Sequence, residues 1–86
     1  MELRYEKQPE KYLRSLDTTT RNKLKEALEK LKRFEGDIDR IKGKPDRFRL
    51  KIFHYRVIFE WIKGTIVITV IEIVPRGQAY KGGRHK

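Results

Sequence analysis

Residues 47–61 constrain the fold more than any other part of this sequence, because they contain two runs that can pair in only one register. Apolar and polar side chains alternate through 47–52 and again through 55–61, which predicts two antiparallel strands joined by a turn at Phe53 and His54. With that turn, three apolar pairs lie on one face: Ile52 with Tyr55, Leu50 with Val57, and Phe48 with Phe59. A slip of one residue would mix apolar and charged side chains. We therefore expect this apolar face to pack against helices.

The opposite face of the same hairpin is basic. Its pairs are Lys51 with Arg56, Arg49 with Ile58, and Arg47 with Glu60. Cations placed directly across from each other repel. A single charge on such a face is ordinarily a solvated surface residue, but three clustered cations with only Glu60 to balance them fit that explanation less well. We interpret Arg56 above all, and Arg49 and Lys51 with it, as a site for a polyanion.

The rest of the chain predicts a small α+β fold. The expected elements are a strand at 2–6, a short helix with Pro9 in its first turn, a second helix that Asp17 or Thr18 caps and Gly36 stops, a loop from Gly36 to Asp46, and a last strand at 65–74. That last strand is apolar on both faces, so we expect it inside the sheet and covered on both sides. The order βααβββ places two N-terminal helices on one face of a small, antiparallel-rich sheet of three or four strands.

Charge is the first indication of function. The 86 residues are expected to form one domain, 1–86, and they carry 22 Lys and Arg against 12 acidic residues, a net charge of +10. The excess is uneven: residues 1–42 have 12 basic and 9 acidic side chains, and residues 43–86 have 10 and 3. A one-sided basic excess favours nucleic acid as the partner, ahead of a membrane surface or an acidic protein.

The sequence also predicts where the protein works. It contains no cysteine, no apolar stretch long enough to span a bilayer as a helix, and no apolar signal region near Met1. We therefore expect a soluble, cytoplasmic protein that does not bind membranes.

The segment after the last strand adds an arginine and an aromatic side chain. Arg76 follows Pro75 directly, and Tyr80 lies among further cations. A lone tyrosine is ordinarily a surface residue or an edge plug of the core, but beside cations it is also a platform on which a base can stack. The residues we expect to bind RNA are Arg47, Lys81 and Arg84.

The sequence excludes several enzyme classes. Ser15 is the only serine, and His54 and His85 are the only histidines, so neither a serine–histidine–acid set nor an all-histidine metal site can form. No carboxylate cluster is expected to bind magnesium, because Asp37 and Asp39 are predicted in a loop. A cationic site with a tyrosine, without metal or other cofactor, remains. Such a site suffices for cleavage of RNA by its own 2′-hydroxyl, because the protein must orient the nucleophile, neutralise phosphate charge and move protons.

Taken together, several segments resemble the RelE/ParE superfamily of toxins from toxin–antitoxin systems. The segments are Ile41-Lys-Gly43, Phe48-Arg-Leu-Lys-Ile, Tyr55-Arg-Val-Ile-Phe-Glu, Val70-Ile-Glu-Ile-Val, Arg76 and Tyr80. In that family a leucine-lysine-glycine loop precedes a tyrosine-arginine-leucine-arginine strand, and an arginine lies four residues before a C-terminal tyrosine. The similarity covers nearly the whole chain, including the strand–helix–helix opening.

The resemblance to the RelE branch implies a toxin that is a ribosome-dependent messenger-RNA endonuclease and inhibits translation. It implies two partners, mRNA on the ribosome and a cognate acidic, RelB-like antitoxin that wraps around the toxin. By position in the family pattern, the catalytic residues are Arg49, Lys51, Arg56, Arg76 and Tyr80. Their implied roles are a phosphate clamp for Arg56, stabilisation of the developing charge for Arg76, base stacking and proton transfer for Tyr80, and RNA holding or proton transfer for Arg49 and Lys51.

Two features depart from the family pattern. The hairpin turn is Phe53-His54, where the family usually has a glycine-containing turn, and Pro75 directly precedes the arginine at 76. His54 is either a loop residue or an additional proton carrier near Arg56. Because some family members end in a catalytic histidine, His85 is a second candidate proton carrier, the alternative being a flexible tail.

Two other functions remain open at this level. Members of the ParE branch poison DNA gyrase and tend to lack the catalytic set, so retention of Arg56, Arg76 and Tyr80 favours the nuclease branch. The second alternative is a non-enzymatic RNA-binding module that uses the same basic face.

Overall fold

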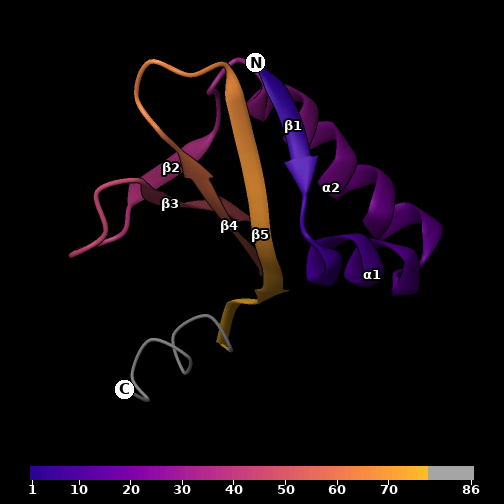
Figure 1. Ribbon diagram of the computed structural model, residues 1–86. Coiled ribbons are helices and arrows are strands. Elements are labelled where there is room, and N and C mark those ends of the chain that lie inside the picture. The colour runs from indigo at the N-terminus through magenta and orange to yellow at the C-terminus, as the bar shows by residue number, and fades with distance from the viewer. Residues whose placement is uncertain (78–86) are drawn as a thin grey trace.

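The computed structural model describes residues 1–77, which form two helices and a five-stranded sheet (Figure 1). In chain order the elements are β1 (Glu2–Tyr5), α1 (Lys7–Ser15), α2 (Thr18–Leu31), β2 (Asp37–Arg40), β3 (Arg47–Ile52), β4 (Tyr55–Trp61) and β5 (Val67–Pro75). The strands lie in the order β1-β5-β4-β3-β2, with β1 parallel to β5 and the other neighbours antiparallel. The predicted α+β class with an antiparallel-rich sheet is confirmed.

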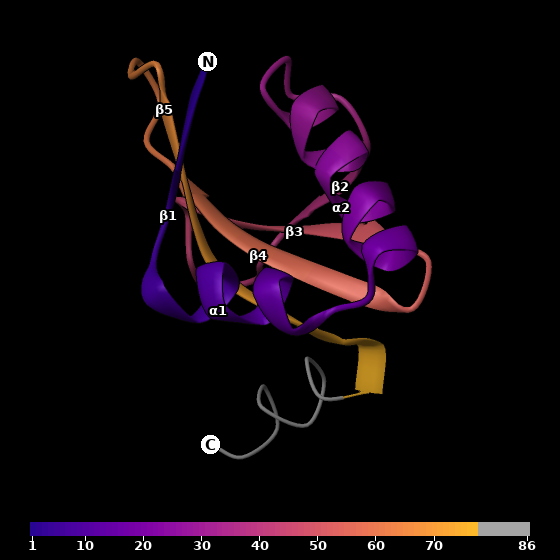
Figure 2. The same ribbon diagram turned by 90° about the vertical axis from the view of Figure 1, so that its right-hand side faces the viewer.

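Both helices lie on the same face of the sheet because the chain must cross from one sheet edge to the other between β1 and β2 (Figure 2). That face, the inner face, is closed by leucines of the helices. The buried core consists of Leu13, Leu24, Leu28, Leu31, Phe48, Leu50, Ile52, Val57, Phe59, Ile68, Val70 and Ile73. The helices therefore leave the opposite, outer face of the sheet uncovered.

The register of the β3–β4 hairpin is the predicted one. Leu50 lies opposite Val57, and Phe48 lies opposite Phe59 with their ring centroids 5.3 Å apart. All four side chains are buried on the inner face. The expectation that the apolar face of the hairpin packs against the helices is confirmed.

The predicted loop from Gly36 to Asp46 is wrong in its first part, where β2 pairs with the edge of β3. Ile38, expected only as a loop anchor, lies opposite Leu50 and packs against the core. Gly36 brings the chain close to that core, since a Cβ added there would lie 2.7 Å from the Leu50 side chain. The sheet consequently has five strands instead of three or four, in the order βααββββ.

Charge complementarity with β3 explains why β2 forms a strand although two of its four residues are aspartates. Aspartate is depleted in strands. In β2, however, Asp37 lies opposite Lys51 and Asp39 lies opposite Arg49. Opposite charges directly across a ladder stabilise the pairing. The cations of β3 therefore stabilise β2, although the sequence of β2 alone does not favour a strand.

β5 is an interior strand, as predicted, and its two faces are covered unequally. Its inner side chains, Ile68, Val70 and Ile73, are fully buried. On the outer face Thr69 is half-buried and Glu72 is exposed. Val74, also on the outer face, is only 8 % exposed, so the predicted cover on both sides holds at that end of β5 and fails at Glu72.

The predicted helix starts are confirmed. Pro9 lies in the first turn of α1, where its missing N–H costs no hydrogen bond. Asp17 caps α2, because its carboxylate accepts hydrogen bonds from the Thr20 backbone N–H at 3.0 Å and from the Thr20 hydroxyl at 2.7 Å. These bonds hold the pKa of Asp17 below its usual value.

The predicted end of the second helix at Gly36 is wrong, because α2 ends at Leu31. Phe34 takes a left-handed conformation with φ 57°. Its N–H donates to the Leu31 carbonyl at 2.7 Å, and the Glu35 N–H donates to the Lys30 carbonyl at 3.1 Å. This pair of bonds is the usual way to close a helix with a left-handed residue, a position that glycine normally fills.

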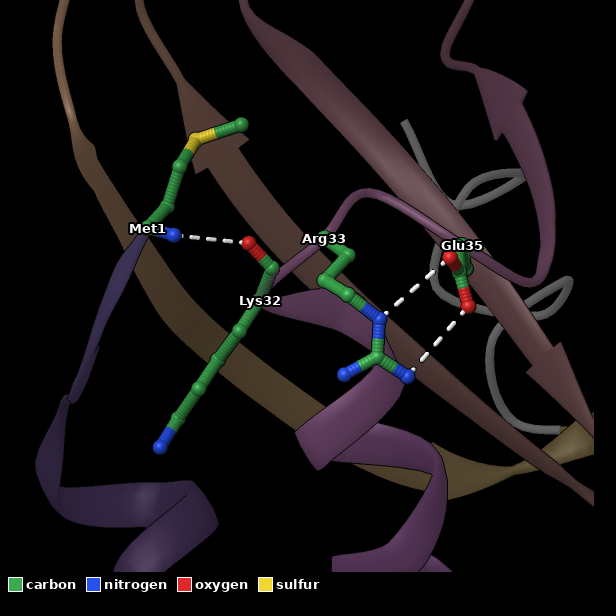
Figure 3. A network of polar contacts seen from close by, with 4 residues as sticks. All are labelled: Met1, Lys32, Arg33 and Glu35. Carbon is green, nitrogen blue, oxygen red and sulfur yellow. Dashed lines mark hydrogen bonds and ion pairs between the residues drawn. The ribbon is translucent and has the colours of Figure 1, made fainter.

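Further polar contacts connect this end of α2 to β1 (Figure 3). The α-ammonium group of Met1 donates to the Lys32 carbonyl at 2.7 Å. A positive charge is favourable there, at the negative end of the helix dipole. Arg33 donates from Nε and Nη2 to the Glu35 carboxylate at 3.3 and 3.4 Å, which adds order to the turn that leads into β2.

Candidate nucleic-acid interface

The outer face of β3 and β4 carries the predicted cations, Arg47, Arg49, Lys51 and Arg56, which we call the basic face. Lys51 lies directly opposite Arg56, Arg49 opposite Ile58, and Arg47 opposite Glu60, as the alternation predicted. Asp37 and Asp39 of β2 border this face at one edge, and Val74 of β5 lies across from Arg56 on the other side.

Arg56 is buried, with only 7 % of its surface exposed, and is not the solvated side chain that its outer-face position suggested. It does not lie among the helices, since its strand partners are Lys51 and Val74. One terminal guanidinium nitrogen donates to the Tyr55 carbonyl at 2.9 Å and to the Phe53 carbonyl at 3.3 Å. These carbonyls hold the guanidinium in place at the hairpin turn.

The guanidinium of Arg56 retains donor capacity after those bonds. Its Nε atom is buried and has no hydrogen-bond partner among the described residues. No described carboxylate lies within ion-pair distance of it either. A buried charge without an acidic partner is costly. Because the Nε atom is itself covered, an anion can reach this guanidinium only at a terminal nitrogen.

The basic face is better balanced than the sequence suggested, because a carboxylate from β2 joins it. Asp39 Oδ2 lies 2.9 Å from Lys51 Nζ, and both side chains are partly exposed. The hydrogen bond and charge of Lys51, with a smaller contribution from the charge of Arg49, hold the pKa of Asp39 below its usual value. Glu60 makes a looser ion pair with Arg47, at 4.0 Å. The expectation that Glu60 alone balances the cations is therefore wrong.

Asp39 was not predicted as a member of this surface, because residues 36–46 were expected to form a loop. The available signal was a single apolar residue, Ile38, between Asp37 and Asp39 directly after a glycine. Four residues are too few for such a pattern to distinguish a strand from a loop without knowledge of a pairing partner.

Arg76 lies at the same end of the sheet as Arg56. Its backbone N–H donates to the His54 carbonyl at 2.7 Å, which brings the segment after β5 against the hairpin turn. The preceding residue, Pro75, lies opposite Tyr55, and the Arg76 side chain is exposed. The proline that departs from the family pattern therefore ends β5 at the turn.

His54 lies in the hairpin turn and is exposed. With Lys23 and Phe53 it lines a hollow of about 210 Å³ between the turn and α2. Phe53 takes the left-handed conformation, φ 51°, that glycine would adopt more easily, and Lys23 Nζ lies 4.8 Å from its ring centroid. A larger hollow of about 390 Å³ lies between α2 and the β2–β3 edge and includes Lys51 but no other predicted site residue.

The remaining site predictions lie outside the described residues: Tyr80, Lys81, Arg84 and His85. Over residues 1–77, no three His, Asp or Glu side chains are grouped as a metal site would require. Neither helix in this part of the chain has the length and apolar character needed to cross a membrane.

Comparison with solved structures identifies the fold. The isolated RelE toxin of E. coli is 24% identical to this chain and superimposes with a TM-score of 0.73, covering 95% of this chain and 93% of RelE. The archaeal RelE of a RelE–RelB complex from Pyrococcus horikoshii OT3 is 26% identical with a TM-score of 0.73, covering 90% of this chain and 96% of that protein. A RelB–RelE antitoxin–toxin complex from Methanococcus jannaschii gives 21% identity and a TM-score of 0.70, over 92% and 96% of the two chains.

The chain therefore has a RelE-like fold over nearly its whole length, and the resemblance inferred from the sequence is confirmed at this level. No protein-family model matches the chain, and no curated protein sequence matches it significantly.

Proposed function

We propose that this chain is the toxin of a toxin–antitoxin pair and that it cleaves messenger RNA on the ribosome, which inhibits translation. Its similarity to RelE structures of bacterial and archaeal origin supports a toxin. The observation that carries the nuclease proposal is Arg56, a buried cation held by two backbone carbonyls, with an unused Nε donor and no acidic partner among residues 1–77.

The proposed reaction uses the nucleophile that RNA itself contains. The 2′-hydroxyl oxygen attacks the adjacent phosphorus and loses its proton, while the bond from phosphorus to the 5′ oxygen breaks and that oxygen takes up a proton. The products are a 2′,3′-cyclic phosphate and a 5′-hydroxyl. Charge develops on the phosphate oxygens, so fixed cationic donors aimed at them lower the barrier.

Each residue has a distinct proposed role in this reaction. Arg56 binds the phosphate, because an arginine fork can contact two of its oxygens at once. Arg76, exposed beside the hairpin turn, stabilises the charge that develops. Tyr80 stacks on a base and transfers a proton, and Arg49 and Lys51 hold the RNA or assist proton transfer. No step requires a metal ion or an organic cofactor.

The proposed partner that silences the toxin is a small acidic antitoxin. The solved relatives include RelE bound to RelB. This chain has a net charge of +10 and presents cations on the outer face of its sheet. An acidic chain can neutralise that surface, and charge complementarity of this kind accelerates association.

Substitution of the two arginines tests the nuclease proposal. Arg56→Met keeps the side-chain length in a buried position while it removes the charge, and Arg76→Ala alters an exposed side chain. Each is expected to lower the rate of message cleavage on purified ribosomes by roughly 100- to 1000-fold, the usual effect of losing one fixed charge-stabilising donor. Arg14→Ala, which removes a cation from the exposed side of α1, is the control and should cleave like the wild type.

Four further measurements complete this test. Melting temperatures show whether Arg56→Met folds. Tyr80→Phe separates the two proposed roles of the tyrosine, since stacking survives loss of the hydroxyl and proton transfer does not. A double variant Arg56→Met, Arg76→Ala that cleaves like the wild type would eliminate this site and direct attention to His54 and His85. A wild-type protein that leaves message intact but inhibits gyrase would support the ParE-like function instead.

A further inference from the structure

Asp39 contacts Lys51 of the basic face, although the sequence predicted a loop where β2 forms. It lies on β2, the edge strand of the sheet, directly opposite Arg49. Its carboxylate reaches diagonally to Lys51 Nζ, at 2.9 Å. One acidic side chain thus interacts with two of the four cations, and the pKa of Asp39 is depressed by both of them.

The ion pair also affects how Lys51 relates to Arg56. Lys51 belongs to β3, which pairs with β2 on one side and with β4 on the other. Its partner in β2 is Asp37, and its partner in β4 is Arg56. Because Asp39 binds the Lys51 ammonium, part of the positive charge that would face a phosphate at Arg56 is already neutralised. A phosphate that uses Lys51 must first displace the carboxylate.

We propose that Asp39 is a specificity residue of the basic face, whose carboxylate competes with RNA phosphates for Lys51. Free RNA has to break the Asp39–Lys51 pair with no other interaction to compensate. RNA that is already held in place, as on a ribosome, can displace the carboxylate because its phosphate is presented at high effective concentration. The acid therefore weakens capture of free RNA more than it weakens use of positioned RNA.

The inference rests on the proposed function, because it assumes that the basic face binds RNA. It assigns Asp39 a positioning role through Lys51 and no role in bond making or breaking. Its consequences can be measured by RNA binding alone, without ribosomes or cleavage.

The test measures binding of a fluorescein-labelled 12-nucleotide single-stranded RNA to the full chain by anisotropy at several salt concentrations. Asp39→Asn is expected to bind about two- to fivefold more tightly at low salt, the range that one exposed ion pair is worth. The slope of log K against log salt should steepen by about 0.7, because one further phosphate is neutralised on a single strand. Melting temperatures should show that the variant folds.

A matched control separates the ion pair from net charge. Asp37→Asn makes the same change in charge, on the same strand and the same face, without removing the carboxylate that contacts Lys51. Its binding should change less than that of Asp39→Asn. In the Lys51→Ala background, Asp39→Asn should gain no more than Asp37→Asn does, because the ion pair is gone and only the change in net charge and the weaker effect on Arg49 remain.

Several outcomes would overturn the inference. Equal effects of Asp37→Asn and Asp39→Asn would show that only net charge matters. A gain from Asp39→Asn that stays as large in the Lys51→Ala background would exclude competition for that lysine. Absence of measurable RNA binding by both the wild type and Asp39→Asn would also overturn it. If the binding results hold while the wild type cleaves no message on ribosomes, the nuclease proposal fails and the role of Asp39 stands.

Discussion

Two phenylalanines of the described chain, Phe34 and Phe53, occupy backbone conformations that favour glycine, with φ of 57° and 51°. The two side chains differ in how much packing they have to compensate for this strain. The Phe34 ring packs against Phe48, Phe59 and Trp61, with centroids 5.3 to 5.9 Å away. The Phe53 side chain is 69 % exposed. At Phe34 the packing of the ring compensates for the strain, whereas at Phe53 little packing does so.

Substitutions at Phe34 can separate strain from packing. Phe34→Ala is expected to lower the free energy of unfolding by about 2–4 kcal/mol, somewhat less than for a fully buried ring. Phe34→Gly should be less destabilising than Phe34→Ala by about 1 kcal/mol, because glycine adopts the left-handed conformation without a Cβ clash. Urea unfolding followed by circular dichroism measures both.

The same substitution at the other site completes that experiment. Phe53→Gly should be neutral or stabilising, since the exposed Phe53 ring contributes one cation–π contact, to Lys23, within residues 1–77. If glycine at position 34 proved worse than alanine, strain would not contribute at that helix end.

At the scale of elements, a side chain continues a strand ladder after the strand itself has ended. β1 stops at Tyr5, and the backbone ladder to β5 ends with the Glu6 N–H and the Val70 carbonyl, 3.0 Å apart. In the first turn of α1, the Gln8 amide then donates to the Ile73 carbonyl at 2.8 Å and accepts from the Ile73 N–H at 2.9 Å. Gln8 thereby satisfies the edge of β5 where β1 no longer covers it.

Removal of the Gln8 side chain is expected to destabilise this edge. Gln8→Ala leaves two backbone groups of Ile73 without their partner, which should cost about 1–3 kcal/mol. Hydrogen exchange of the Ile73 amide should become faster, and urea unfolding gives the loss in stability. Lys11→Ala introduces the same residue at an exposed position of α1 and is the control. Unchanged exchange at Ile73 would show that the Gln8 contact does not protect this edge.

At the scale of the whole molecule, the sheet separates two functions. Its inner face forms the core with both helices (Figure 2). Its outer face carries the four cations of the basic face. A net charge of +10 attracts polyanions, and salt weakens that attraction. We propose that the antitoxin covers these cations.

Co-expression tests that role. The small acidic protein expected from the adjacent reading frame should relieve growth arrest caused by this chain and should co-purify with it as a stable complex. The complex should weaken as ionic strength rises, because screening reduces attraction between opposite charges. An unrelated acidic protein of similar charge is the control and should not relieve arrest. Continued arrest with only weak co-purification would contradict the proposal.

The candidate site was partly predictable because the alternation of a strand indicates which face each side chain lies on as well as where the strand is. Once the turn at Phe53 and His54 was assumed, the alternation placed Arg49, Lys51 and Arg56 on one face without tertiary information. It did not reveal that Arg56 is buried, because burial depends on what lies beside a strand and not on its own periodicity.

The sequence by itself determined the strand pairing of residues 47–61, the inner face and the helix starts, since these depend on local periodicity, turns and caps. Only the tertiary structure decided where β2 lies, since a four-residue strand with two aspartates forms through its partner strand β3. It also decided that Phe34 ends α2 in a left-handed conformation, because aromatic neighbours from β3 and β4 hold its ring. Long-range contacts overrode local preference in both places because their packing and charge pairing are worth more than the local cost.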